Sequence, residues 1–132
     1  MIKFRNNLNY HDWIKAHNYS ILSPRHRGMY AEMVFRKYCL INKIFAQKIN
    51  PKIDILAQID ADFLKKIQQK ELKNLGKIPY NWFCMELGQG YFVEVKMGTS
   101  NMTKEQRNVK FQRNKLYLFR VFEDGEIIIK KL

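Results

Sequence analysis

Glu94 and Lys96 stand two residues apart at the end of an apolar run that begins at Tyr91. Side chains on a strand alternate between its two faces, so Glu94 and Lys96 share one face. Asn81, at the start of the preceding apolar run, joins them on that face if the two runs pair as a hairpin. A carboxylate, an amide oxygen and an ammonium gathered in this way could bind a hard divalent cation and a phosphate group.

The shared face depends on how the turn between the two runs is built. A two-residue loop over residues 88–89 begins with glycine, as a type II′ turn requires. This register places Leu87 opposite Gly90 and Asn81 opposite Lys96, whereas a loop of odd length moves Asn81 to the other face. An exposed Glu-x-Lys on a strand is commonly only a solvated face, so the spacing by itself leaves both interpretations open.

Composition indicates one folded domain with a polyanionic partner. The chain has 132 residues, of which 46% are apolar and 14% aromatic, enough for a single core. We expect one domain over residues 1–132, with residues 1–22 as an extension that packs on or beside the core. The 24 lysines and arginines outnumber the 12 acids and give a net charge of +12. This excess favours nucleic acid as the partner and an anionic membrane surface less strongly.

The same sequence gives no sign of secretion or membrane insertion. No apolar run approaches the roughly 20 residues that a membrane-spanning helix needs. The first residues contain no apolar stretch of the kind found in a secretory signal, so we expect an intracellular protein. Cys39 and Cys84 lack the spacing of a zinc site, and we expect both to be reduced and buried.

Hydrophobic periodicity and capping residues predict a mixed α/β domain with a central sheet flanked by helices. Ser23 and Pro24 are typical of a helix start, and Asp60 and Gly76 of the start and end of another. The predicted helices cover residues 8–18, 24–41, 60–76 and 103–114. The predicted strands lie within residues 43–49, 52–59, 80–87, 91–96, 116–122 and 126–132, and the last four form two hairpins.

The succession of these residues resembles the core of the PD-(D/E)XK nuclease superfamily, which includes restriction endonucleases and archaeal Holliday-junction resolvases. Pro79 matches the family's Pro-Asp element, and Glu94 and Lys96 match the Glu-x-Lys that ends the following apolar strand. Gln106 matches a glutamine in the helix after that strand, and Glu32 matches an acid in the first core helix. The resemblance covers roughly residues 28–122. It implies a restriction-endonuclease-like central mixed sheet of about four to five strands.

The resemblance also implies a Mg²⁺-dependent endonuclease that acts on duplex or branched DNA, with Mn²⁺ able to replace Mg²⁺. Asn81 and Glu94 would hold the metal, and Glu32 would complete or orient its coordination shell. Lys96 would stabilise the attacking hydroxide or the transition state, and Gln106 would support Lys96 or a water. We expect a homodimer, because cutting both strands with one active site per chain usually needs two chains.

Asn81 departs from the family pattern, which has aspartate there as a principal metal ligand. An amide oxygen can coordinate a cation but carries no charge, so metal affinity should fall. Three explanations remain open. Asn81 is an engineered inactivating change, or it is natural and leaves a module that binds DNA without cutting it. Alternatively, Asp54 is the working ligand, with residues 60–90 as an insertion.

Two basic clusters are candidates for DNA contact. One lies at the start of the predicted helix 24–41, where backbone amides and the helix dipole favour phosphate. The other forms a stripe along the predicted helix 103–114. Simpler interpretations also exist: a solvated basic turn, an ion pair between Glu32 and Arg36, and a capping box that uses Gln106. The candidate DNA-binding residues are Arg25, His26, Arg27, Lys104, Arg107, Lys110 and Arg113.

Overall fold

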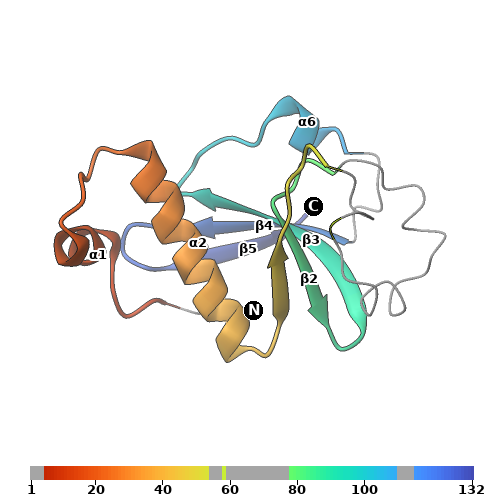
Figure 1. Cartoon of the computed structure of the whole chain (residues 1–132), viewed down its shortest axis with the longest axis horizontal. Coiled ribbons are helices and arrows are strands. Elements are labelled where there is room, and N and C mark those ends of the chain that lie inside the picture. Colours follow the sequence, from red (N-terminus) through yellow and green to blue (C-terminus); the bar gives the residue numbers. More distant parts are fainter. Residues whose placement is uncertain (1–4, 54–57, 59–77, 110–114) are drawn as a thin grey trace.

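The computed structural model describes residues 5–53, 58, 78–109 and 115–132. In this part of the chain, three helices and five strands form a mixed α/β fold, as predicted (Figure 1). In chain order they are α1 (Tyr10–His17), α2 (Pro24–Ile41), β1 (Phe45–Lys48), β2 (Trp82–Glu86), β3 (Gln89–Met97), α6 (Lys104–Arg107), β4 (Leu116–Val121) and β5 (Ile127–Lys131).

The five strands form one sheet in the order β1-β2-β3-β4-β5. Neighbouring strands are antiparallel except for β3 and β4, which are parallel. A parallel pair cannot be joined by a tight turn, and here the connection passes through α6. The sheet is therefore two antiparallel units that meet along a parallel seam in its interior.

Helix α2 covers one face of the sheet and lies diagonally across the strands (Figure 1). It begins at Pro24, after Ser23, whose side chain accepts a hydrogen bond from the His26 N–H. Its buried side includes Val34 and Phe35, and the Phe35 ring meets Phe119 of β4 edge-on at 5.1 Å between centroids. The predicted helix 24–41 is confirmed.

The segment before α2 belongs to the core. Tyr10, Trp13 and Ile14 of α1 are buried in the same apolar cluster as α2 and the sheet. Backbone hydrogen bonds also tie this segment to the turn between β4 and β5, with Asn6 N–H donating to Gly125 O at 2.8 Å. The expected N-terminal extension thus packs on the core in its described residues.

Alternation along β3 divides its side chains between two apolar clusters. Val93 and Met97 join the cluster beneath α1 and α2, whereas Phe92 joins a second cluster on the opposite face. Because of this alternation, Glu94 and Lys96 lie on the face away from α2. The fold therefore places Glu94 and Lys96 on the sheet face opposite the one that α2 covers.

The hairpin between β2 and β3 differs from the predicted register. Met85 lies opposite Gly90, and the loop consists of Leu87 and Gly88, with φ of 50° and 79°. Two positive φ angles are typical of a type I′ turn, whose twist matches that of the flanking strands. The pairing has shifted by two residues, which leaves the faces unchanged and moves Asn81 from opposite Lys96 to the level of Glu94.

Leu87→Asn is expected to raise the free energy of unfolding by about 1 kcal/mol, because asparagine tolerates a positive φ better than leucine. Leu87 is 98% exposed, so the substitution removes no packing. Urea unfolding measures the change. Leu22→Asn is the matched control, since Leu22 is also exposed but has no positive φ. An equal effect in both variants would contradict the turn explanation.

Two predicted elements differ from the structure in their described residues. Lys52 and Ile53 lie in a turn and Gln58 is helical, so the predicted strand 52–59 is wrong at these three positions. The predicted helix 103–114 is shorter where it is described, because α6 ends at Arg107. Residues 54–57, 59–77 and 110–114 lie outside the described part, including the predicted helix 60–76.

Both cysteines are buried and form no disulfide, as expected. Contact with Cys39 and burial raise the pKa of the Cys84 thiol.

No helix within the described ranges is long and apolar enough to cross a bilayer.

Candidate functional site

Glu94 is the centre of the candidate site. Its side chain is buried, with 2% of the residue surface exposed, in the middle of the sheet face away from α2. The Asn81 side-chain amide donates to Glu94 Oε1 at 3.4 Å. The other carboxylate oxygen, Oε2, is buried and has no hydrogen-bond partner among the residues that the structure describes. Buried polar atoms are nearly always paired, so this oxygen marks Glu94 as a candidate for a functional role.

Burial raises the pKa of Glu94 to about 7. The positive charge of Lys96 and the backbone N–H of Asn81 lower this pKa, and the negative charge of Glu32 raises it. Removal of water from the carboxylate outweighs both favourable contacts. Glu94 can therefore gain or lose a proton near neutral pH, and a cation beside it would favour the deprotonated carboxylate.

Lys96 lies two residues beyond Glu94 on β3 and is partly exposed. Parallel pairing places it level with Arg120 of β4, so two basic residues stand side by side on this face. The Arg120 guanidinium donates to the carbonyl oxygens of Gly98 at 3.0 Å and Ser100 at 2.7 Å. Arg120 therefore fixes the loop that follows Lys96. Sequence reasoning missed Arg120, because its place depends on the parallel seam.

Glu32 of α2 binds Lys48 of β1, with Nζ–Oε1 and Nζ–Oε2 distances of 2.8 and 3.0 Å. No ion pair joins Glu32 to Arg36, although the structure describes both side chains. Arg36 lies over the Trp82 ring at 5.2 Å instead. The ion pair thus ties Glu32 to β1. This strand is the neighbour of β2, which begins directly after Asn81. Lys48 was not singled out from the sequence, and only the alternation along residues 45–48 could have indicated it.

Gln106 serves as a capping residue. Its side-chain oxygen accepts the Thr103 N–H at 2.9 Å, and its own N–H donates to the Thr103 hydroxyl at 3.2 Å, which is the predicted capping box. The Tyr80 hydroxyl donates to the backbone oxygen of Gln106 at 3.2 Å. Gln106 therefore anchors α6 beside the residue that precedes Asn81. A direct role toward Lys96 stays a prediction.

The basic cluster at the start of α2 is largely engaged in internal contacts. The Arg27 guanidinium pairs with Glu123 and lies over the Tyr10 ring at 5.4 Å. The His26 ring stacks on Tyr19 at 4.2 Å between centroids. Arg25 is exposed. Of the three candidates, Arg25 is the one whose placement best suits contact with DNA phosphate.

The stripe after β3 is described only in part. Lys104 and Arg107 are exposed on α6, with the helix between them one turn long. Lys110 and Arg113 lie outside the described residues, as does Asp54, the alternative metal ligand. The structure thus leaves these three assignments as predictions.

A hard cation such as Mg²⁺ would need oxygen ligands from the side chains near Glu94. The described residues contain no group of three or more histidine, cysteine, aspartate or glutamate side chains placed to hold a metal. The contact between Asn81 and Glu94 is made by the Asn81 amide N–H, so the amide oxygen is not the atom that faces the carboxylate. Mg²⁺ commonly uses one or two protein carboxylates with water and a substrate phosphate. The pair therefore offers one carboxylate, and an amide oxygen only if the Asn81 side chain turns.

Comparisons with protein family models, with curated proteins and with solved structures give no match for this chain.

Proposed function

We propose that this chain is a Mg²⁺-dependent DNA endonuclease whose activity is weakened by asparagine at position 81. The observation that carries the proposal is the buried Glu94 carboxylate, with one oxygen unpaired and the other in contact with Asn81. Lys96 stands beside it on the same strand, in a chain of net charge +12. This arrangement suits a polyanion with a scissile phosphate.

In this proposal Glu94 would hold the cation through its carboxylate, and Asn81 would turn its amide oxygen toward the cation in place of the N–H that now donates to Glu94. When bound, Mg²⁺ supplies Lewis-acid polarisation of the phosphate and neutralises part of its charge. Lys96 stabilises the negative charge that grows on the phosphate oxygens as water attacks. Glu32, fixed by Lys48, contributes negative charge that favours a cation near Glu94. Arg120 keeps the loop after Lys96 in place.

The rival proposal is a module that binds DNA without cutting it. Asn81 favours it, because an amide contributes no charge to a metal site and pairs with Glu94 as it stands. Basic surface alone would sustain such binding. The two proposals agree on the DNA partner and differ in whether Glu94 and Lys96 act on a phosphate.

Purified chain is incubated with supercoiled plasmid and with a four-way DNA junction, in Mg²⁺, in Mn²⁺ or in a chelator. We expect slow, metal-dependent nicking that Glu94→Gln and Lys96→Met each abolish, with DNA binding retained. Equal nicking by the variants would indicate a contaminating nuclease. Binding without nicking in either metal would favour the rival proposal.

The proposed DNA contact of α6 has its own test. The double variant Lys104→Gln/Arg107→Gln is expected to weaken DNA binding and to reduce the slope of log Kd against log salt concentration by about 2. Fluorescence anisotropy across a salt series measures the slope. Lys15→Gln/Lys130→Gln removes the same charge from exposed positions on α1 and β5 and is the control. If the control variant loses as much slope, then DNA binding depends on the total charge of the chain and not on α6.

A further inference from the structure

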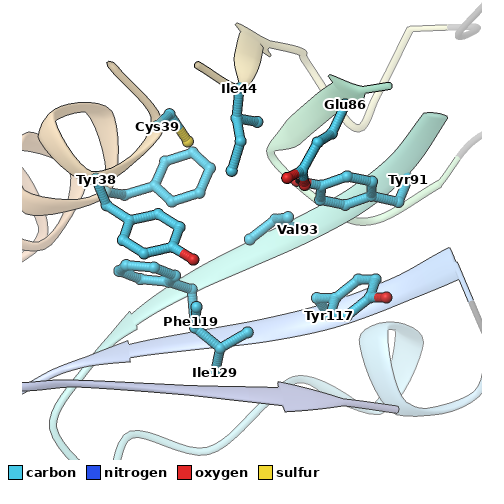
Figure 2. A pocket seen from close by; sticks show the side chains of 10 residues that line it. Tyr38, Cys39, Ile44, Glu86, Tyr91, Val93, Tyr117, Phe119 and Ile129 are labelled. Carbon is cyan, nitrogen blue, oxygen red and sulfur yellow. Dashed lines mark hydrogen bonds between the residues drawn. The ribbon is translucent and has the colours of Figure 1, made fainter. Parts of the chain in front are cut away.

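A cavity lies on the α2 face of the sheet, between α2 and strands β3, β4 and β5 (Figure 2). Its volume is about 150 Å³. A cavity of this size accommodates a benzene-sized molecule. Val93 belongs to its wall, so the cavity is on the side of β3 opposite to Glu94. It is therefore separate from the candidate nuclease site.

Aromatic rings make up much of the cavity wall. Tyr91 of β3 and Tyr117 of β4 meet edge-on at 5.1 Å between centroids. Tyr38 of α2 lies tilted against Phe119 at 5.4 Å. Figure 2 shows these rings around a common space, with the Tyr38 hydroxyl pointing into it. Aromatic faces carry partial negative charge and attract cations.

The cavity also has a carboxylate at its mouth. Glu86, at the end of β2, is the only aspartate, glutamate, lysine, arginine or histidine in its described lining. The Tyr91 hydroxyl donates to Glu86 Oε2 at 3.3 Å. No lysine or arginine among the described residues forms an ion pair with Glu86, although basic residues outnumber acidic ones 24 to 12 in the chain.

The negative charge of Glu86 affects two tyrosines of the cavity wall. Burial is the main cause that raises the pKa of Tyr38, and the charge of Glu86 is the second. Burial also raises the pKa of Tyr91, with Glu86 among the further causes. Tyr38 is on α2 and Tyr91 on β3, so the Glu86 carboxylate acts on rings from both sides of the cavity.

We propose that this cavity binds a small organic cation, an alkylammonium ion, with its charge against Glu86 and its alkyl groups against Tyr38, Tyr91 and Tyr117. Rings and one carboxylate around a small space suit a cation with an apolar surface better than a metal ion, which needs several oxygens. Glu86 is exposed and accepts a hydrogen bond from Tyr91, so it is available at the mouth of the cavity to attract the charge of such a cation. The proposal does not depend on the nuclease function.

The test compares choline with 3,3-dimethylbutan-1-ol, which has the same shape and no charge. Each is titrated into the full chain while ¹³C-methyl NMR follows Val93 and Ile129 in the cavity and Ile78 on the other face. We expect choline to shift the cavity methyls alone and to bind about tenfold more tightly than the neutral alcohol. The comparison uses unaltered protein, so it does not depend on a variant that folds.

Glu86→Gln is expected to remove the preference for choline and to leave binding of the neutral alcohol unchanged. Glu105→Gln, which removes an equal charge from an exposed position on α6, should bind choline as the unaltered chain does. Equal binding of both compounds to the unaltered chain would overturn the assignment and leave an apolar cavity. Failure of choline to shift Val93 and Ile129 would also overturn it.

Discussion

Asn81→Asp is expected to raise the rate of metal-dependent DNA nicking on the order of a hundredfold. The new carboxylate would face Glu94, whose Oε1 now contacts the Asn81 amide. Two carboxylates at this distance repel one another unless a cation lies between them, so metal affinity should rise with the rate. Plasmid nicking in Mg²⁺ and Mn²⁺ measures the rate, and thermal unfolding with and without Ca²⁺ measures metal binding.

Three further variants define this gain. Asn81→Asp combined with Glu94→Gln, or with Lys96→Met, should return nicking to the original level. Asn7→Asp adds the same charge at an exposed position and should change nothing. If Asn81→Asp neither nicks DNA nor gains stability from Ca²⁺, then position 81 is not a metal ligand. Such a result would favour Asp54 as the ligand or the rival binding module.

Glu94→Gln is expected to stabilise the metal-free protein by about 3 kcal/mol at pH 8 and to give little change at pH 4.5. The pKa of Glu94 is raised from 4.5 to about 7 by burial. Below pH 4.5 the folded and unfolded chains both keep the proton, so there is no penalty. Between pH 4.5 and 7 the unfolded chain releases the proton more readily, and stability falls as pH rises. Above pH 7 the penalty is complete.

Chemical denaturation in the presence of a chelator, repeated at pH 4.5, 6 and 8, measures this effect. The informative quantity is the difference between variant and unaltered chain, because other groups also titrate in this range. Glutamine has nearly the shape of glutamate and no charge to bury, so packing is retained. Glu105→Gln, which removes a carboxylate from an exposed position, is the control. If the difference for Glu94→Gln does not change with pH, then ionisation of the Glu94 carboxylate does not lower the free energy of unfolding.

Much of the fold could be predicted because its signals are local. Ser23 followed by Pro24 marks the start of α2, and the capping box of Thr103 and Gln106 marks the start of α6. The hairpin register was missed because two turns were compatible with the same glycines, and leucine is an unusual residue at positive φ. The pairing differs from the prediction by two residues. A shift of two keeps every side chain on the same face, so Asn81, Glu94 and Lys96 still share one face.

The candidate site was predictable only where it depends on one hairpin. Asn81 and Glu94 come from paired strands, and the structure brings them into contact. Lys48 and Arg120 reach their places through the pairing of β1 with β2 and of β3 with β4. Such pairings join segments far apart in sequence, and no local pattern announces them. The burial that perturbs Glu94 likewise depends on the complete sheet.

The parallel seam between β3 and β4 has a consequence for how the protein folds. The β2–β3 and β4–β5 hairpins pair residues close in sequence, whereas the seam pairs Lys96 with Arg120 and the β1–β2 pairing joins Lys48 to Trp82. Contacts over longer separations form later, because chain entropy must be lost before they are gained. We therefore expect the hairpins to be early structures and their lateral docking to be the slow step. Lys96 and Arg120 would come together only when the two hairpins dock, in the same step that joins the core residues Val93 and Phe119.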